Sequence, residues 1–338
     1  MTETMTTTEP YEVIVIGGGA AGLSAALVLG RARRRTLVVD AGEPRNAPSA
    51  HMQGFLTRDG MPPAEFLALG REEVARYEDV AQIRDRAVDV TRDGGTGDVT
   101  RDGGTGDVTR DGGTGAFAVT LESGRTAHAR RLIVTTGLKD ELPPVPGLAE
   151  RFGEDVLHCP YCHGWEVRDR AFGVLATTPL SVHQALMVTQ WSPDVTFFLH
   201  TVDESELSDQ DLRRLAAAGV KVVPGEVAEV LTADDRLTGV RLADGTVHER
   251  EVLFTAPRAI PQTGLLERLG ARLDATPFGA YPVVDPTGQT SVPGVYAAGN
   301  AMGFAEQVPH AVSGGYRAAA AVNGELLMTD LDGAFGEG

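Results

Sequence analysis

The first structured stretch of the chain constrains the fold more than any other part. It begins with an apolar run, Tyr11–Ile16, that predicts a buried strand of a parallel sheet. A glycine-rich turn over Gly17–Gly22 and a small, apolar helical stretch over Leu23–Gly30 follow. A second buried strand is predicted over Thr36–Asp40. This order forms one strand–helix–strand unit and predicts an α/β fold.

The turn itself has the pattern GxGxxG, formed by Gly17, Gly19 and Gly22. The first glycine permits a tight turn, the second lets the backbone approach a pyrophosphate, and the third allows the helix to pack closely on the strand. The N-terminus of the following helix offers N–H groups and a positive dipole end to phosphates. Asp40, at the end of the second strand, can accept hydrogen bonds from ribose hydroxyls. The pattern therefore predicts a dinucleotide site, with a purely structural turn as the alternative.

Length and charge limit the size of the protein and its partners. The 338 residues suggest about two domains. A net charge of -17 disfavours nucleic acid and anionic membranes as partners. The chain has no apolar run long enough to cross a bilayer, and its start, MTETMTTTEP, lacks the basic and apolar parts of a secretory signal. We therefore expect a cytoplasmic protein that binds neither nucleic acid nor membrane.

The chain has two cysteines, Cys159 and Cys162, in the segment HCPYCHGWE. A CxxC pair can close a disulfide and exchange it with an external dithiol, and a helix start nearby would lower the thiol pKa. The flanking histidines, His158 and His163, would allow a zinc site, but adjacent Cys–His pairs bind one ion awkwardly and there is no second cysteine pair. We therefore expect redox exchange and no metal, with zinc or an inert buried pair as the alternatives.

Three separated motifs carry a resemblance to a known family: GGGAAG at the first turn, TTG over Thr135–Gly137 and YAAGN over Tyr296–Asn300. Together they resemble the two-dinucleotide-binding-domain flavoproteins, and the order of parts resembles the low-molecular-weight thioredoxin reductases. The resemblance covers nearly the whole chain apart from a repeated segment. It implies FAD as cofactor, a homodimer, and a split, Rossmann-like FAD-binding domain. Residues 1–140 and 252–338 would form that domain, around an inserted NADPH-like domain, 141–251, that carries the cysteines.

The resemblance also implies which residues hold FAD. One position departs from the family pattern, because Asn300 stands where these proteins usually have Asp. Its amide can still hydrogen-bond a ribityl hydroxyl, although without charge. The residues expected to contact FAD are Gly17, Gly19, Gly22, Asp40, Gly42, Arg45, Thr136, Gly137, Gly299, Asn300, Gln307 and Val308.

The same resemblance assigns roles around the cysteine pair. In that family the first cysteine meets the substrate and the second faces the flavin, which implies these roles for Cys159 and Cys162. His163 stands where thioredoxin reductases usually have Asp, and a histidine titrates near neutrality, so it suits deprotonation of an incoming thiol. A surface histidine with a structural hydrogen bond is the alternative. His310, near the start of the last predicted helix, could move protons or modulate flavin charge, or else cap or pack the helix.

The inserted domain lacks the nucleotide turn that a thioredoxin reductase needs. In the segment GVLATTPLS, Gly173–Ser181, there is no GxGxxG, and Pro179 and Leu180 replace the small residues that let a backbone approach phosphate. The next predicted strand is followed by TVDESE, which is acidic where a 2′-phosphate would need basic residues. We therefore predict that NADPH does not reduce this protein.

The motif CPYCHGWE with this degenerate nucleotide site resembles the dithiol oxidases of gliotoxin and holomycin biosynthesis. Those enzymes close disulfides in small natural products and protect the producer. The resemblance implies that a small dithiol is oxidised through the cysteine pair and FAD, and that O2 takes the electrons to give hydrogen peroxide. The alternative is a thioredoxin reductase, fed by NADPH or ferredoxin, that reduces a thioredoxin-like protein. A flavin-bound sensor without turnover is a third class, which the intact cysteine pair argues against.

Two further stretches are expected to lack regular structure. The sequence DVTRDGGTG occurs three times in tandem over Asp89–Gly115, between predicted strands Ala87–Val90 and Phe117–Leu121. Its low apolar content predicts an elongated hairpin loop, with calcium binding by its acidic residues as the alternative. The last helix is predicted over Val308–Leu327, followed by a disordered tail from Asp330.

Overall fold

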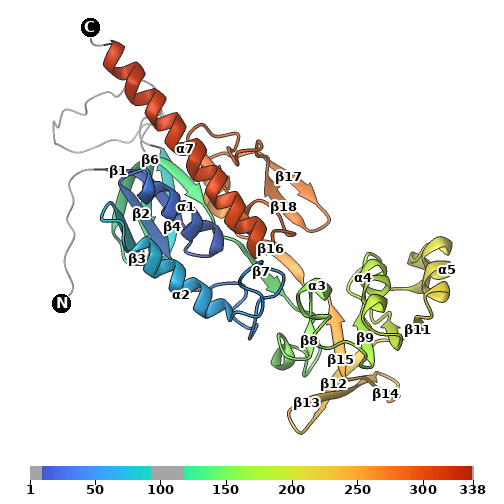
Figure 1. The fold of residues 1–338 in the computed structure, drawn as a ribbon. Coiled ribbons are helices and arrows are strands. Elements are labelled where there is room, and N and C mark those ends of the chain that lie inside the picture. The colour runs from blue at the N-terminus through green and yellow to red at the C-terminus, as the bar shows by residue number, and fades with distance from the viewer. Residues whose placement is uncertain (1–9, 93–116, 337–338) are drawn as a thin grey trace. The chain divides into compact units, whose positions relative to one another are not determined.

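The computed structural model describes residues 10–92 and 117–336, which form two compact units (Figure 1). In the described part of the chain, no helix is long and apolar enough to cross a membrane. Each unit is made of more than one stretch of chain. Unit 1 consists of Met1–Arg45, Ala64–Lys139 and Ile260–Gly338, and unit 2 consists of Asn46–Pro63 and Asp140–Ala259.

This division differs from the predicted domain boundaries in two places. Strand β15 (Val252–Thr255) pairs in parallel with β9 (Phe172–Leu175), so it belongs to the sheet of unit 2, and unit 1 resumes only after Ala259. Residues 46–63 also belong to unit 2, although the sequence places them inside the first predicted domain. Close packing accounts for this, because a Cβ on Gly153 would clash with the carbonyl group of Pro48.

A mixed sheet forms the centre of unit 1 (Figure 1). Its strands run in the order β3-β2-β1-β6-β5-β4, and β19 also pairs with β6. The pairings among β1, β2, β3, β6 and β19 are parallel, whereas β5 is antiparallel to both β4 and β6. The strands are β1 (Tyr11–Ile16), β2 (Thr36–Asp40), β3 (Val80–Arg84), β4 (Ala87–Arg92), β5 (Phe117–Leu121), β6 (Thr126–Val134) and β19 (Val295–Ala297), with a separate hairpin of β17 (Leu273–Thr276) and β18 (Gly279–Pro282).

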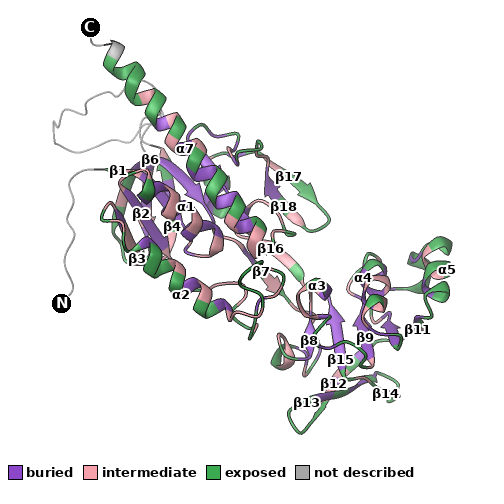
Figure 2. Cartoon of the chain, viewed as in Figure 1, coloured by how far each residue is buried: buried purple, intermediate pink, exposed green. Residues whose placement is uncertain are grey.

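Both faces of the parallel part of this sheet are buried, which explains its continuous apolar runs (Figure 2). In β1, Val13 and Val15 face one hydrophobic core, whereas Ile14 and Ile16 face the other. Helices α1, α2 and α7 contribute to the first core and α6 to the second. The predicted strand–helix–strand unit is therefore confirmed. The helices are α1 (Ala20–Arg31), α2 (Pro63–Val74), α6 (Gly264–Arg268), α7 (Val308–Gly336) and the 3-10 turn η4 (Gly299–Ala301).

The last helix, α7, is longer than the sequence predicts. It continues to Gly336, so the predicted disorder is wrong for residues 330–336. The carboxylate of Asp330 pairs with Arg34 at 3.1 Å and with Arg130 at 2.6 Å. These ion pairs connect the last turns of α7 to the rest of unit 1.

The predicted strands on either side of the tandem repeats are confirmed as the antiparallel pair β4 and β5. Strand β4 continues to Arg92, so the expected loop is wrong for residues 89–92, the first four of the repeats. Residues 93–116 themselves lie outside the described residues. The expected hairpin loop and its calcium-binding alternative therefore stay predictions.

Unit 2 is built on a second parallel sheet, in the order β11-β10-β9-β15-β8. Helices α4 and α5 share one core with the buried rings of Phe172, Phe197 and Phe254. A second core joins the other face of the sheet to the antiparallel strands β12 and β13. The strands are β8 (Val156–Leu157), β9 (Phe172–Leu175), β10 (Val195–Phe198), β11 (Lys221–Val223), β12 (Val227–Ala233), β13 (Arg236–Leu242), β14 (Val247–Glu249) and β15 (Val252–Thr255); the helices are η1 (Ala149–Arg151), α3 (Pro160–His163), α4 (Ser181–Met187), η2 (Val188–Gln190), η3 (Glu204–Glu206) and α5 (Asp209–Ala217); β7 (Leu138–Glu141) and β16 (Arg258–Pro261) pair where the chain passes between the units.

Candidate functional site

The glycine turn of unit 1 connects the carboxyl end of β1 to the N-terminus of α1. Gly17 has φ +110°, a conformation that residues with a Cβ rarely adopt. Thr135, which follows β6, directs its hydroxyl at the carbonyl groups of Ile16 and Gly17, at 2.9 Å from each. The neighbouring strand therefore holds the turn in place.

Gly19 and Gly22 differ in what surrounds them. A Cβ on Gly22 would collide with the carbonyl group of Gly17, so close packing of α1 against the turn requires a glycine here. A Cβ on Gly19 would meet no atom of the described residues within 4 Å. Gly19 is also the N-cap of α1, and within the described residues no side chain caps it. The turn thus forms an open cradle at a helix N-terminus, which fits the pyrophosphate of FAD.

Asp40 fixes the loop next to this cradle. Its Oδ1 accepts hydrogen bonds from the backbone N–H groups of Gly18 at 3.1 Å and Gly42 at 3.2 Å. Gly42 has φ +74°, and a Cβ there would lie 2.7 Å from the guanidinium group of Arg84. The half-buried carboxylate therefore shapes the turn, in addition to the ribose contact that the sequence predicts.

Asn300 has hydrogen-bond partners within the chain. Its amide nitrogen donates to the carbonyl groups of Gly303 at 2.9 Å and Phe304 at 3.2 Å. Its Oδ1 accepts from the guanidinium group of Arg45 at 3.3 Å. The structure thus gives Asn300 a role in shaping the loop after Gly299, and joins it to another predicted FAD residue.

Thr136 and Gly137 lie beside another loop of unit 1. The hydroxyl of Thr136 donates to the carbonyl group of Gln262 at 2.8 Å. The backbone N–H of Gln262 donates to the carbonyl group of Gly137 at 3.1 Å. The backbone of Gln262 therefore hydrogen-bonds both Thr136 and Gly137.

The remaining candidates of unit 1 lie at the start of α7. Val308 is its first residue, and the carbonyl group of Gln307 accepts from the N–H of Ala311 at 2.8 Å. His310 is exposed in the first turn. All the predicted FAD residues, together with His310, thus belong to unit 1.

The cysteine pair lies in unit 2, directly after the carboxyl end of β8. Cys159 and Cys162 form a disulfide, with their Cα atoms 5.2 Å apart. Cys159 is the N-cap of the one-turn helix α3, and Pro160 occupies the first helical position, where its missing N–H leaves no bond unmade. The N–H of Cys162 donates to the carbonyl group of Cys159 at 3.1 Å, which closes the turn.

The surroundings of the pair are fixed on one side and open on the other. The buried side chain of Gln184, on α4, donates to the carbonyl group of His158 at 2.6 Å. Gly164 packs so closely on Trp191 that a Cβ would lie 2.7 Å from its ring. By contrast, Tyr161 is 71% exposed and Trp165 is 65% exposed. These two aromatic side chains offer an apolar surface next to the disulfide.

His163 ends α3 and is half-buried. Its Nε2 lies 3.2 Å from the hydroxyl of Ser49, in the 46–63 segment. Burial lowers the pKa of His163 below its ordinary value, and the Cys159 backbone and the charge of Glu166 oppose this effect only in part. The imidazole is therefore neutral at pH 7 and can accept a proton from a thiol.

The strand–turn–helix of unit 2 is closed where that of unit 1 is open. Between β9 and α4, the hydroxyl of Ser181 accepts hydrogen bonds from the N–H groups of Thr177 at 3.1 Å and Thr178 at 3.4 Å. The N–H of Ser181 donates in turn to the carbonyl group of Thr178 at 3.0 Å. The Ser181 side chain thus already accepts from the backbone N–H groups that would have to donate to a phosphate.

The acidic segment after β10 is folded on itself. Asp203 accepts from the N–H of Ser205 at 2.8 Å, and Glu206 accepts from the N–H of Asp203 at 3.0 Å, which forms a capping box around η3. Preceding them, His200 accepts from the N–H of Val227 at 3.0 Å. This segment presents carboxylates where a nucleotide 2′-phosphate would need positive charge.

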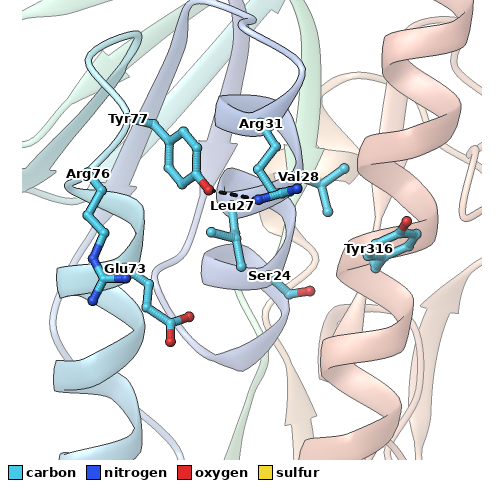
Figure 3. Close-up of a pocket in the computed structure, with 8 residues that line it drawn as sticks. All are labelled: Ser24, Leu27, Val28, Arg31, Glu73, Arg76, Tyr77 and Tyr316. Carbon is cyan, nitrogen blue, oxygen red and sulfur yellow. Dashed lines mark hydrogen bonds between the residues drawn. The ribbon is translucent and has the colours of Figure 1, made fainter.

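A separate hollow of about 420 Å³ lies on unit 1, between α1, α2 and α7 (Figure 3). The guanidinium group of Arg31 donates to the hydroxyl of Tyr77 at 3.1 Å on one side, and Tyr316 of α7 lines another. None of the predicted site residues is among the residues that line it. The hollow therefore belongs neither to the glycine cradle nor to the cysteine pair.

Sequence reasoning missed four residues that shape these sites: Ser49, Thr135, Ser181 and Gln184. Thr135 carried a signal, because it begins the TTG motif at the end of a predicted strand. Ser181 also carried one, since a serine at the start of a helix commonly accepts from nearby backbone N–H groups. Ser49 and Gln184 carried none, because their partners at 163 and 158 are reached only through the tertiary fold.

Comparison with known proteins shows similarity across both units. The family described as pyridine nucleotide-disulphide oxidoreductase matches residues 11–315. Thioredoxin reductase sirT from Leptosphaeria maculans is 32% identical over 333 residues, which cover 95% of this chain and 96% of the relative. Thioredoxin reductase tcpT from Claviceps purpurea (strain 20.1) is 32% identical over 335 residues, covering 97% and 98%. The crystal structure of HlmI has 44% sequence identity and a TM-score of 0.89, and the match covers 98% of both chains.

Proposed function

Because the chain belongs to the pyridine nucleotide-disulphide oxidoreductase family, and is thus a FAD-dependent disulfide oxidoreductase, we propose that it is a dithiol oxidase. Its substrate would be a small natural product with two thiols, of the holomycin type, and its product the intramolecular disulfide. Dioxygen would be the final electron acceptor. The recognition of a thioredoxin reductase-like flavoprotein fold, with FAD as cofactor, is confirmed by the comparisons.

One observation carries the proposal: an intact disulfide lies in the same unit as a nucleotide turn that the protein fills itself. The hydroxyl of Ser181 accepts from the N–H groups of that turn, and carboxylates follow the next strand. Electrons from NADPH would need a phosphate at these donors. We therefore infer that the electrons that reduce the disulfide come from a substrate dithiol and not from a nicotinamide.

The residues of the chain account for the exchange chemistry. His163 accepts the proton of one substrate thiol, and the thiolate attacks Cys159, which gives a mixed disulfide and releases Cys162 as a thiolate. The second substrate thiol then closes the product disulfide and releases Cys159. Two electrons thus pass from the substrate to the cysteine pair. When bound, FAD supplies the two-electron oxidation that restores the disulfide, with O2 reduced to hydrogen peroxide.

Reduction of a thioredoxin-like protein is the second candidate function. Two relatives carry the name thioredoxin reductase, which favours it. It would use the same cysteines in the opposite direction, with electrons from NADPH or ferredoxin. The closed turn at Ser181 argues against NADPH as the donor.

Aerobic mixing of the FAD-loaded protein with reduced holomycin, reduced gliotoxin and reduced thioredoxin, without any nicotinamide, tests the proposal. We expect disulfide product and an equal amount of peroxide from a small dithiol, and neither from the variant Cys162→Ser. Turnover of thioredoxin alone, or anaerobic bleaching of the flavin by NADPH, would overturn the proposal and support the second candidate.

We further propose that the enzyme acts as a cytoplasmic homodimer, which the resemblance implies. The exposed side chains of Leu327, Met328 and Leu331 give α7 an apolar surface that suits a second copy of the chain. Light scattering on the purified protein should give twice the chain mass of 35.7 kDa. A monomer at micromolar concentration would contradict this part of the proposal.

A further inference from the structure

A loop of unit 1 connects the end of β19 to the start of α7 and carries four of the residues expected to contact FAD. These are Gly299, Asn300, Gln307 and Val308. After the turn η4, residues 303–307 form neither helix nor strand, and Phe304 is their only large apolar side chain. A segment with few buried contacts has little stability of its own. The loop therefore depends on a small number of contacts for its shape.

The amide of Asn300 supports this loop from within. Its nitrogen donates to the carbonyl groups of Gly303 at 2.9 Å and Phe304 at 3.2 Å. Its Oδ1 accepts from the guanidinium group of Arg45 at 3.3 Å. Carbonyl groups only accept and a guanidinium group only donates, so the two ends of the amide cannot be exchanged. A carboxylate at position 300 could not make the two donations, so the asparagine is what fixes the backbone at Phe304.

The ring of Phe304 is held from outside the loop by Phe278. The two rings are stacked, with their centroids 4.0 Å apart and their planes at 27° to each other. Phe278 lies at the tip of the hairpin formed by β17 and β18, and each of the two side chains is 39% exposed. An aromatic pair at this spacing stabilises by more than the area that it buries. The stack therefore links the loop to the hairpin at the surface of unit 1.

The hairpin tip that carries Phe278 is itself held by hydrogen bonds. The N–H of Phe278 donates to the hydroxyl of Thr276 at 3.1 Å, and that hydroxyl donates to the carbonyl group of Gly279 at 2.8 Å. The carbonyl group of Phe278 accepts from the hydroxyl of Tyr281, a buried side chain, at 3.1 Å. Gly279 has φ +114°, a conformation that favours glycine. Both backbone polar groups of Phe278 thus have local partners, and the turn presents its ring to Phe304.

We propose that Phe278 is a positioning residue for FAD, which acts through its stack on Phe304 to keep the loop from Gly299 to Val308 in the shape that the cofactor needs. Phe278 is not among the residues expected to contact FAD. The stack and the Asn300 amide hold the loop before the cofactor binds. If only a fraction of the molecules had this shape, the apparent affinity for FAD would fall by that fraction. The inference concerns cofactor binding, goes beyond the proposed function and holds for either direction of electron flow.

Titration of the full chain with FAD, after removal of bound cofactor, tests the proposal by flavin fluorescence. Phe278→Ala should weaken FAD binding about 3- to 10-fold, the size expected for the loss of one aromatic pair. Phe278→Tyr keeps the ring and should bind FAD like the native protein. Tyr316→Ala removes another exposed aromatic side chain of unit 1, away from this loop, and is the matched control. Equal affinity in Phe278→Ala and the native protein would overturn the proposal.

A double-mutant cycle tests whether Phe278 acts through Phe304. Phe304→Ala alone should weaken FAD binding to a similar extent. Adding Phe278→Ala to it should cause no further loss, because the partner ring is already gone. Independent, multiplicative losses would show that Phe278 acts in some other way and would contradict the proposal.

Hydrogen exchange of the FAD-free chain, read by mass spectrometry, shows whether the effect is local. In Phe278→Ala we expect faster exchange over residues 302–307 and unchanged exchange in β1 and β6. Unchanged exchange in the loop would mean that the stack does not hold it. Faster exchange throughout unit 1 would assign Phe278 to the stability of the whole unit and not to the loop. Either result would overturn the proposal.

These tests are independent of dithiol turnover. If no small dithiol is oxidised but FAD affinity and loop exchange respond as expected, the role of Phe278 stands and the oxidase assignment fails. If a dithiol is oxidised but FAD affinity does not respond to Phe278→Ala, the reverse holds.

Discussion

Each unit contains a parallel strand that passes through a short turn into a helix. The two turns differ in whether the protein itself provides an acceptor for their backbone N–H groups. In unit 1, the turn after β1 has a glycine with open space around it at position 19, and α1 continues from it for 12 residues. In unit 2, the turn after β9 closes on the hydroxyl of Ser181, and α4 has 7 residues. The topology is the same, but one turn leaves its donors for a ligand and the other satisfies them internally.

This difference shows that a strand–turn–helix segment can lack a nucleotide site and still keep its fold. The sheet of unit 2 keeps its parallel order and its buried core. A single side-chain oxygen is enough to replace the phosphate as acceptor for two N–H groups. The unit thereby serves as a carrier for the disulfide, and the side chain of Gln184 on α4 fastens the peptide before Cys159.

The substitution with the largest expected effect closes the open turn of unit 1. In Gly19→Val the new Cβ meets no atom of the described residues within 4 Å, so we expect the fold to be unchanged, while the side chain fills the cradle. Loss of two charge-assisted hydrogen bonds of about 2 kcal/mol each would weaken FAD binding about 1000-fold. Titration of the apoprotein with FAD, followed by flavin fluorescence, measures this. Unchanged affinity would show that the cradle is not where the pyrophosphate binds.

The next effect concerns stability and should be confined to unit 2. Asp155 is buried and accepts from the guanidinium group of Arg151 at 2.9 Å and 2.8 Å and from the N–H of Leu237 at 2.8 Å. Asp155→Ala leaves Arg151 without this partner and should lower the free energy of unfolding by about 3 kcal/mol. Denaturant unfolding gives the value. Asp235→Ala removes the exposed partner of the same arginine and should change stability by no more than about 1 kcal/mol.

His163→Ala should slow the oxidation of a small dithiol about 100-fold while FAD remains bound, because the general base is lost. Stopped-flow reduction of the flavin under anaerobic conditions measures the rate. The exposed His183, on α4, provides the matched control, and its replacement by alanine should have no effect. An unchanged rate in His163→Ala would eliminate this histidine as the base.

The same histidine predicts a pH dependence. Burial lowers the pKa of His163, so the base stays unprotonated until the pH falls below the ordinary value of about 6.5. The native rate should decline below that pH, and His163→Ala should lack this decline. For stability, the unfolded chain binds the proton more readily than the folded one. The contribution of His163 is therefore full above about pH 6.5 and is lost as the pH falls through the lower pKa of the folded state.

The substitution with the smallest expected effect opens the closed turn of unit 2. Ser181→Ala deprives the N–H groups of Thr177 and Thr178 of their acceptor and should lower the free energy of unfolding by about 1 kcal/mol. Thermal unfolding with and without NADPH checks both parts of the comparison. NADPH should stabilise neither the native protein nor the variant. A rise in melting temperature with NADPH in the native protein would show that the turn accepts a phosphate after all.

Local patterns in the sequence were enough to predict the first strand–helix–strand unit. Its apolar runs are continuous because both faces of β1 are buried, and its glycines are spaced for the turn. The defect in the second turn was also visible, because Pro179 and Leu180 interrupt the expected small residues. Such features depend on near neighbours in the chain.

Features that depend on distant contacts could not be predicted in the same way. Nothing near Asp330 indicates that its carboxylate will meet Arg34 and Arg130 and extend the last helix. Nothing near Ser49 indicates that its loop belongs with the cysteines, because that follows from the fit of Pro48 against a glycine far along the chain. The candidate site was therefore predicted as a set of reactive groups, whereas the groups that orient them came from the structure.

The origin of unit 2 from two separate stretches of chain has a consequence for recombination between relatives. Exchanging residues 140–259 as one block would transplant both sulfurs and the imidazole but leave the host's own 46–63 loop behind. Such a hybrid would combine a histidine from one parent with a hydroxyl, or its absence, from the other. Substrate preference and proton handling should therefore be inherited together only when both stretches are exchanged.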